Sequence, residues 1–339
     1  MTVDVASFAR RIPKAELHVH LEGTIAPATY AHIAARNGVD AGDVNALFAC
    51  TDFPSFLQAF LKVVDVLRAP IDFAELAAEY LQKSAADGVR HVEFFLSPAT
   101  QRKFVPGLDL KAMVGAIGDA CRRARSRYGI SSLLIFDMVR NLGEDVALHD
   151  IELALQCRDD GVVGIGLGGD ERNFPARDFQ TAYARARDHG LRRTAHAGEA
   201  AGPESIVDCV TLLGAERIGH GVAARGRPEV LALLRDQNVS VDACPTSNRY
   251  TAALMSGEAY PLREFLDAGV AVSLSSDDPA FFKASIADEY ANAAALGCGV
   301  REIAAIAKFS FEKSFLPEAD KRRLAAEVDA YCVAAGITR

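Results

Sequence analysis

The chain alternates short runs of β-forming residues with longer amphipathic stretches, and this alternation limits the folds open to it. Strands are expected at 15–19, 89–96, 132–139, 162–167, 193–196, 217–219, 239–243 and 270–275. Helices are expected between them, at 73–86, 110–128, 146–158, 179–189, 205–213 and 228–237. Because parallel strands need crossover connections, the repeated units predict a parallel sheet. Eight units favour an α/β fold of the (β/α)8 TIM-barrel type over an open doubly wound sheet, and no Gly-x-Gly-x-x-Gly follows the first strand to mark a dinucleotide site.

One domain is expected for residues 1–339, because half of the residues are apolar and an α/β barrel with insertions reaches this length. The connection 21–88 is too long for one crossover helix, so a helical insertion is expected there, with helices at 26–37 and 54–67. It is either a lid over the catalytic face or an ordinary packed helix pair. The tail from Arg301 predicts two or three extra C-terminal helices. The apolar side chains at the second inserted helix are Phe53, Phe56, Leu57 and Phe60.

The net charge of −8 is spread over interspersed acidic and basic residues without a basic stripe, so a nucleic acid is not expected as a partner. No apolar run approaches the roughly 20 residues that span a bilayer, so a membrane is not expected either. The seven cysteines are widely spaced and form no Cys-x-x-Cys pair, as is typical of reduced thiols. We therefore expect a soluble cytoplasmic protein, as a monomer or a homo-oligomer.

Two histidines on the first expected strand indicate a metal site. His18 and His20 are two residues apart, so the period of a strand places both imidazoles on one face. Two neutral imidazoles at this spacing chelate one divalent ion, and imidazole suits zinc. The alternative for the pair alone is two exposed or hydrogen-bonded histidines.

Further groups that bind metal or carry protons follow other expected strands. His196 ends one strand and Glu199 comes three residues later, His220 follows another, and Asp277 and Asp278 follow the last. A barrel gathers the carboxyl ends of its strands on its catalytic face. Three histidines and an aspartate leave one zinc position open, and zinc generates hydroxide from bound water near neutral pH. His220 is then available to take a proton and Glu199 to supply one. Taken alone, Asp277-Asp278-Pro279 also fits a helix N-cap.

At this point the chain resembles the adenosine/adenine deaminase branch of the amidohydrolase superfamily, the metallo-dependent hydrolases, over about residues 11–320. The resemblance rests on five motifs found in order along the chain. They are Pro13-Lys14-Ala15-Glu16-Leu17-His18-Val19-His20-Leu21-Glu22-Gly23-Thr24, Gly168-Gly169-Asp170-Glu171, Ala195-His196-Ala197-Gly198-Glu199, Arg217-Ile218-Gly219-His220-Gly221 and Ser275-Ser276-Asp277-Asp278-Pro279.

The resemblance implies zinc-dependent hydrolytic deamination of a 6-aminopurine or its nucleoside. In that pattern one Zn²⁺ per chain is held by His18, His20, His196 and Asp277. Glu199 protonates purine N1, His220 and Asp277 position the attacking hydroxide, and Asp278 meets N7. The backbone of Gly169 meets N3, and His20 and Glu22 also belong to the substrate site. The side chains that match the family's apolar gate are Phe53, Phe56, Leu57 and Phe60.

The motifs divide over the substrate. Leu21-Glu22-Gly23-Thr24 resembles the adenine-type enzymes, whereas adenosine-type enzymes have Asp at the position of Glu22. Gly169-Asp170-Glu171 and Ile218-Gly219-His220 resemble the adenosine type. Because two motifs agree and Glu22 keeps a carboxylate that can reach a sugar, we predict adenosine. The alternatives are adenine and another N6-substituted purine or nucleoside.

Two other classes of function compete with this interpretation. An amidohydrolase acting on a different ring or amide would release no ammonia from either purine. A catalytically silent barrel would need none of the acid, base and ligand residues found here. The zinc signature of nucleic-acid deaminases, His-x-Glu with Pro-Cys-x-x-Cys, is absent from the sequence.

Overall fold

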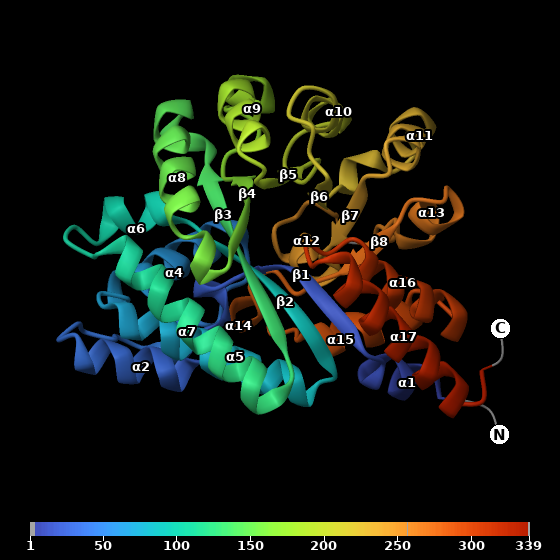
Figure 1. Cartoon of the computed structure of the whole chain (residues 1–339), viewed down its shortest axis with the longest axis horizontal. Helices are drawn as coiled ribbons and strands as arrows, with labels where there is room; N and C mark the ends of the chain where they lie inside the picture. The colour runs from blue at the N-terminus through green and yellow to red at the C-terminus, as the bar shows by residue number, and fades with distance from the viewer. Residues whose placement is uncertain (1–3, 256, 338–339) are drawn as a thin grey trace.

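The computed structural model describes residues 4–255 and 257–337, and within them eight parallel strands form a barrel in sequential order (Figure 1). The (β/α)8 prediction is confirmed, and each expected strand is present with its ends moved by at most a few residues. The strands are β1 (Lys14–His20), β2 (Val89–Leu96), β3 (Ser131–Val139), β4 (Val162–Gly168), β5 (Arg192–Ala197), β6 (Arg217–His220), β7 (Ser240–Ala243) and β8 (Val272–Leu274).

The barrel closes where the end of β1 meets the residues that follow β8. The Asp277 N–H donates to the carbonyl of His18 at 3.1 Å, and the His20 N–H donates to the carbonyl of Asp277 at 2.9 Å. The hydroxyl of Ser275 accepts from the backbone N–H of His18 at 3.1 Å. The backbone hydrogen bonds that join the first and last strands therefore also fix the relative position of three candidate metal ligands and their neighbours.

The predicted crossover helices form the outer layer of the barrel (Figure 1). Gly129 ends one of them with a positive φ of 71°, and its N–H donates to the carbonyl of Arg125, as expected for a glycine at a helix end. These helices are α5 (Pro70–Ala86), α7 (Leu110–Tyr128), α8 (Glu144–Gln156), α9 (Gln180–Asp188), α10 (Pro203–Thr211) and α11 (Pro228–Asp236).

Three additional helices lie between β1 and α5. After the 3-10 turn η1 (Glu22–Thr24) come α2 (Pro27–Arg36), α3 (Val44–Leu47) and α4 (Phe53–Val66). The buried Asp72 of α5 anchors the end of α2 to α5, because its carboxylate accepts hydrogen bonds from Arg36 at 2.5 Å and from Asn37 at 2.7 Å. The span 21–88 therefore holds one outer-layer helix, α5, and an insertion proper of α2 to α4.

The C-terminal part contains the two helices expected after residue 301, α16 (Val300–Glu312) and α17 (Glu318–Ala334). Most of the helices that were not predicted have at most about two turns, which leave little periodicity in a sequence, and one, Ile286–Ala295, is longer, with ten residues. Three of these begin with proline in the first turn, which is a usual start for a helix. The helices not predicted are α1 (Val5–Arg11), α3, α6 (Pro98–Phe104), α12 (Pro245–Tyr250), α13 (Leu262–Asp267), α14 (Pro279–Phe282) and α15 (Ile286–Ala295).

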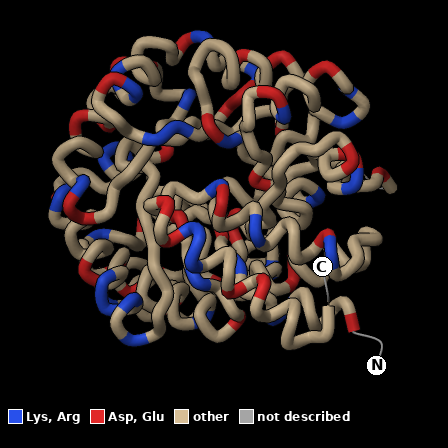
Figure 2. Tube along the Cα trace, turned by 45° about the vertical axis from the view of Figure 1, so that its right-hand side comes forward, with Lys and Arg blue, Asp and Glu red and all other residues tan. Residues whose placement is uncertain are grey.

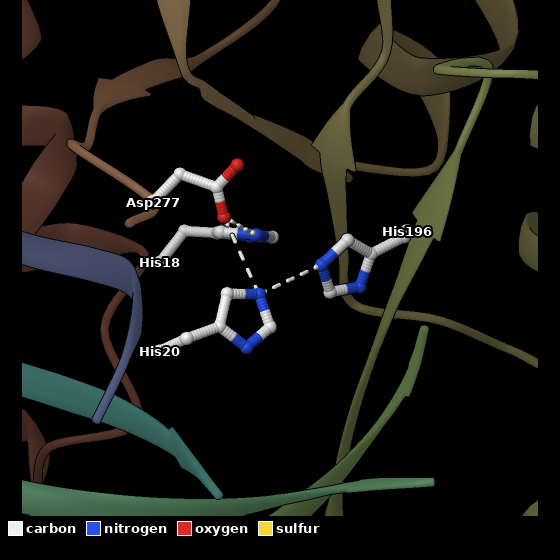
Figure 3. Close-up of side chains that lie close together, drawn as sticks. All are labelled: His18, His20, His196 and Asp277. Carbon is white, nitrogen blue, oxygen red and sulfur yellow. Dashed lines mark hydrogen bonds and ion pairs between the residues drawn. The ribbon is translucent and has the colours of Figure 1, made fainter. Parts of the chain in front are cut away.

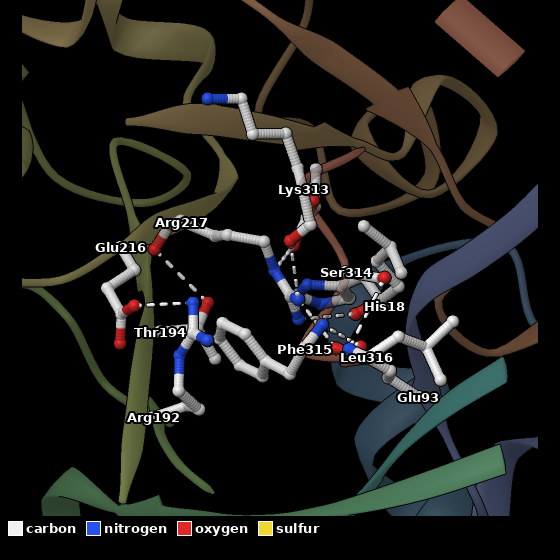
Figure 4. Close-up of polar contacts among 12 residues, drawn as sticks. His18, Glu93, Arg192, Thr194, Glu216, Arg217, Lys313, Ser314, Phe315 and Leu316 are labelled. Atoms are coloured by element: carbon white, nitrogen blue, oxygen red, sulfur yellow. Dashed lines mark hydrogen bonds and ion pairs between the residues drawn. The ribbon is translucent and has the colours of Figure 1, made fainter. Parts of the chain in front are cut away.

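A buried ion-pair network fills the barrel interior next to His18 (Figure 4). Arg217 pairs with Glu93 at 2.5 Å and with Asp242 at 2.9 Å, and its guanidinium lies 3.9 Å from the centre of the Phe315 ring. It also donates to the carbonyl of Leu17 at 3.2 Å. Burial alone would raise the pKa of Glu93, but the charge of Arg217 lowers it to about 2. These contacts link β1, β2, β6 and β7 below the candidate site.

Lys and Arg residues are interspersed with Asp and Glu residues along the trace, and neither sign of charge is concentrated in one part of this view (Figure 2). Among the described residues, no helix combines the length and the apolar character needed to cross a membrane.

Candidate metal centre and active site

His18, His20, His196 and Asp277 converge at the carboxyl end of the barrel (Figure 3). Nε2 of His20 lies 3.3 Å from both Nε2 of His196 and Oδ1 of Asp277, and Nε2 of His18 lies 3.4 Å from the same oxygen. One ligand atom from each residue lies within 4.8 Å of the others. Ligand atoms about 2.0–2.2 Å from one zinc ion lie roughly 3–3.5 Å from one another, so these separations fit a shared zinc ion.

The electrostatics of the four residues also fit a bound cation. Burial lowers the pKa of His18 to about 3 and that of His196 well below its usual value, so both imidazoles are neutral, as metal ligands must be. Burial acts in the same direction on His20, but Asp278 and Asp277 overcome it and raise its pKa to about 10. The carboxylates thus favour positive charge at this point. Both ring nitrogens of His18 and Oδ1 of Asp277 are buried without a hydrogen-bond partner.

The backbone around the centre explains two of the sequence motifs. A Cβ on Gly219 would stand 2.6 Å from Cε1 of His18, so only glycine leaves room for that ring. His220 and Asp277 both have a φ of 66°, a left-handed conformation that costs a non-glycine residue about 1–3 kcal/mol. Such strain is concentrated at functional sites, where it aims side chains that ordinary strand geometry would turn away.

Two side chains of α12 hold the polar groups of the centre in place. Ser247 donates from its hydroxyl to Oδ2 of Asp277 at 2.6 Å. The side-chain amide of Asn248 lies 3.0 Å from Nδ1 of His220. Sequence analysis assigned neither residue a role, although both lie in the Cys244-Pro245-Thr246-Ser247-Asn248 segment directly after β7, where a barrel places functional groups.

A second group of potential ligands overlaps the first. His220, Cys244 and Asp277 also bring one donor atom each within 4.8 Å. Burial raises the pKa of the Cys244 thiol well above its usual value, and a protonated thiol is a poor ligand. The group is therefore part of the same centre and not a separate metal site.

His220 and Glu199 lie beside the four-residue centre. The ring of His220 is 5.0 Å from that of His18 between centroids, and its Nε2 lies 3.5 Å from Oε2 of Glu199. Burial raises the pKa of Glu199, and the nearby carboxylates of Asp277 and Glu171 add to the effect. Glu199 is thus suited to hold a proton, as an acid that donates to a substrate must.

Two buried residues that sequence analysis gave no role fix the loop that carries Glu199. The carboxylate of Glu171 accepts hydrogen bonds from four successive backbone N–H groups, at 2.5 to 3.1 Å, from Gly198, Glu199, Ala200 and Ala201. Arg140 donates to the carbonyl of His196 at 2.7 Å and to that of Phe174 at 2.9 Å. The position of the acid is therefore set from the ends of β3 and β4.

Asp277 and Asp278 have opposite protonation preferences despite being adjacent. Burial acts to raise the pKa of Asp277, but contacts with His18 and His20 bring it well below the usual range. Burial and the charge of Asp277 raise the pKa of Asp278 well above its usual value. A neighbouring pair split in this way provides one ionised ligand and one neutral donor. A Cβ on Gly23 would overlap the Asp278 carboxyl, so the glycine after Glu22 is needed for this packing.

Glu22 lies in η1 and is almost fully buried. It accepts a hydrogen bond from the side-chain amide of Gln101 in α6 at 2.9 Å, and burial raises its pKa. Sequence analysis did not identify Gln101, because helix α6 itself was not expected. Gly169 follows β4 with a φ of 93°, and a Cβ there would stand 2.6 Å from Oδ1 of Asn141. Both the conformation and the space at Gly169 therefore require glycine.

The four apolar residues expected as a gate lie on α4, where the ring centroids of Phe53 and Phe56 and those of Phe56 and Phe60 are each 6.0 Å apart. Phe56 packs on Phe281 and Phe282, with ring centroids 5.4 and 5.0 Å apart, and Phe60 lies 6.4 Å from Phe281. These partners belong to α14, which begins directly after Asp278. Phe53 and Leu57 are 48% and 44% exposed. The insertion therefore contacts the helix that follows the catalytic strand end.

The sequence matches the adenosine deaminase family over residues 13–331. An aminodeoxyfutalosine deaminase from Streptomyces avermitilis is 39% identical, over 98% of this chain and 94% of its own length. An adenine deaminase from Cupriavidus metallidurans is also 39% identical, over 97% of this chain and 94% of its own length.

Two solved structures share the fold at full length. An adenine deaminase from Arthrobacter aurescens has a TM-score of 0.89 and 33% identity, covering 95% of this chain and 99% of its own. An amidohydrolase from Burkholderia ambifaria with bound Zn has a TM-score of 0.91 and 26% identity, covering 100% of this chain and 97% of its own.

Proposed function

Because the chain belongs to the adenosine deaminase family, and is a hydrolytic deaminase of the amidohydrolase type, we propose that it removes the 6-amino group of adenine to give hypoxanthine and ammonia. One observation carries the proposal: the four-residue centre lies beside a proton acceptor, His220, and a proton donor, Glu199. A hydrolysis at a ring carbon needs these three elements together.

We assign one Zn²⁺ per chain to His18, His20, His196 and Asp277. Their spacing, the neutral imidazoles of His18 and His196 and the unpartnered buried atoms of His18 and Asp277 support this choice of ligands. When bound, zinc lowers the pKa of water towards about 7 and so supplies the nucleophile of a hydrolysis.

The side chains around the centre transfer protons, orient the attacking water and bind the purine. Glu199 donates its proton to purine N1, which makes C6 electrophilic. His220, held by Asn248, takes a proton from the attacking water, and Asp277 helps to orient that water. His220 then returns that proton to the amino nitrogen, the C6–N bond breaks and ammonia leaves. The hydroxyl now on C6 gives its proton back to Glu199 as the C6 carbonyl forms, so that one water is consumed for each amino group released. Asp278 stays protonated and donates to N7, an acceptor, while the backbone of Gly169 meets N3.

The substrate is the point at which the proposal departs from the sequence-based prediction of adenosine. Among the relatives, an adenine deaminase is 39% identical over nearly the whole chain, and a second adenine deaminase shares the fold at 33% identity. Glu22 also supports a free base: it is buried, interacts electrostatically with His20 and keeps an oxygen besides the one that accepts from Gln101. A free base has an N9–H to donate, whereas a nucleoside carries a sugar at that position.

A second candidate substrate is aminodeoxyfutalosine, because a deaminase of that compound is also 39% identical, over 98% of the chain. The chemistry at C6 would be the same and only the group on N9 would differ. We further propose that α2 to α4 act as a lid, since Phe56 reaches the helix that follows Asp278.

A three-substrate assay tests the proposal. The zinc-loaded protein is incubated separately with adenine, adenosine and aminodeoxyfutalosine, and ultraviolet absorbance and released ammonia are followed together. The proposal predicts the highest kcat/KM with adenine. Preference for aminodeoxyfutalosine or adenosine would keep the catalytic assignments and replace the substrate, and no ammonia from any of the three would contradict the proposal.

A further inference from the structure

Asp137 of β3 is a buried carboxylate that no step of the proposed reaction uses. Its Oδ1 lies 3.7 Å from Nδ1 of His196, the ring nitrogen on the side away from the metal centre. Both atoms are buried, and neither has a hydrogen-bond partner among the described residues. A buried polar atom without a partner loses its hydrogen bonds to water and gains none, so two such atoms facing each other call for an explanation.

The neighbouring strand is shaped around this carboxylate. A Cβ on Gly166 of β4 would stand 2.6 Å from Oδ1 of Asp137, and a Cβ on Gly168 would overlap Oδ2. Glycine in a strand interior weakens the strand, and it marks a place where another group approaches closely. Here the group that approaches is Asp137. The two glycines of β4 leave the space that its carboxylate occupies.

The protonation of the His196 ring decides whether Nδ1 can donate a hydrogen bond to Asp137. Its Nε2 points to Nε2 of His20 at 3.3 Å, within the candidate metal centre. A neutral imidazole that gives Nε2 to a metal carries its one proton on Nδ1, and that N–H needs an acceptor. Arg140 donates a hydrogen bond to the backbone carbonyl of His196 and so fixes its backbone. The orientation of the His196 ring is therefore the part that a further contact can set.

We propose that Asp137 is a positioning residue for His196: its carboxylate accepts the Nδ1–H and keeps Nε2 directed at the other three ligands. The inference rests on the metal site of the proposed function. The separation of 3.7 Å is longer than a hydrogen bond of about 2.7–3.2 Å, so the proposal requires the carboxylate and the ring to lie closer together when the metal is bound.

Metal affinity provides the test, because it does not depend on which purine is the substrate. Zinc dissociation constants are measured by chelator competition on the full-length holoenzyme and on the variants Asp137→Ala and Asp137→Asn. Loss of a group that orients a ligand weakens metal binding by about 10- to 100-fold, which is the result expected for Asp137→Ala. Asp137→Asn keeps an amide oxygen that accepts from Nδ1–H, so its affinity should fall less.

A matched control is Asp150→Ala, which removes another buried aspartate, in α8, whose partner is Arg102 at 2.9 Å. It should leave zinc affinity unchanged. If Asp137 only fills space, Asp137→Ala will bind zinc within twofold of the wild type and differ in thermal stability alone, which would overturn the inference. A wild-type protein that binds no zinc would overturn both the inference and the metal site of the proposed function.

Discussion

Glu171 holds Glu199 through the backbone: its Oε2 accepts the N–H of Glu199 at 3.1 Å, together with the N–H groups of Ala200 and Ala201. A carboxylate at the end of β4 thus positions the acid that follows β5. The contact relates two motifs, Gly169-Asp170-Glu171 and Gly198-Glu199, that lie almost 30 residues apart in the sequence.

The first prediction concerns this contact. Glu171→Ala leaves four backbone N–H groups without their acceptor, so the loop that carries Glu199 should shift. A displacement of about 1 Å at a catalytic group can cost about 10²-fold in rate, and we expect a loss of kcat of that order with zinc retained. Steady-state kinetics and metal content check this. Glu171→Gln keeps an acceptor oxygen and should lose less, and a kcat of Glu171→Ala within twofold of the wild type would refute the role.

The second prediction concerns Glu199 as the acid. General acid catalysis is worth about 10²- to 10⁴-fold, so Glu199→Gln should keep zinc and lower kcat by at least about 10²-fold. Because the pKa of Glu199 is raised, the wild type should lose activity only as pH rises above that raised value, and the variant should lack this dependence. Glu204→Gln, an exposed glutamate five residues later, is the matched control and should behave as the wild type. Near-normal turnover of Glu199→Gln would remove Glu199 from the mechanism.

The third prediction concerns the lid. Phe56→Ala removes two of the ring contacts between α4 and α14, the helix that directly follows Asp278. Aromatic pairs contribute about 0.5–1.5 kcal/mol each, so the loss of two should raise KM by about 5- to 150-fold while kcat changes less. Phe53→Ala removes an exposed ring that lies 6.0 Å from the ring of Phe56 between centroids, and it should change KM less. Equal, unchanged KM values in both variants would mean that the insertion does not act as a lid.

The fourth prediction concerns stability. Glu93→Gln leaves the buried Arg217 with Asp242 as its charged partner, and breaking a buried pair costs about 3–5 kcal/mol. The pKa of Glu93 is depressed to about 2 from 4.5. Its stabilising effect is therefore fully present above pH 4.5 and is lost as pH falls towards 2.

Urea unfolding at several pH values, with EDTA present so that metal release does not contribute, measures this effect. The difference between wild type and Glu93→Gln should be constant from pH 7 to about 4.5 and should narrow below it. A difference that grows as the solution becomes more acidic would contradict the assignment of the charge pair.

The sequence was sufficient for the strands and for the groups at their ends, because strand periodicity and barrel topology both leave a local pattern. The spacing of His18 and His20, for example, places both rings on one face. Asp137 was missed even though it carries a signal, a lone charge within the apolar run Leu133-Leu134-Ile135-Phe136-Asp137-Met138-Val139. The role of Asp137 depends on the glycines of the neighbouring strand β4. Which strands pair cannot be determined from a local stretch of sequence.

Other contacts could not be predicted because they join segments whose structure was itself unforeseen. Gln101 reaches Glu22 from α6, and Ser247 reaches Asp277 from α12, both short helices with little periodicity. The left-handed backbone at His220 and Asp277 also has no local signature, since neither residue is glycine. Tertiary contacts impose that conformation.

A zinc titration with adenine as substrate tests the central claim most directly. The protein is stripped of metal, zinc is returned in steps, and adenine deamination is measured at each step. Activity should rise in proportion to zinc and level off at one equivalent per chain, with His196→Ala inactive throughout. Full activity in the metal-free protein, or a plateau at a different stoichiometry, would contradict the assignment of a single zinc to His18, His20, His196 and Asp277.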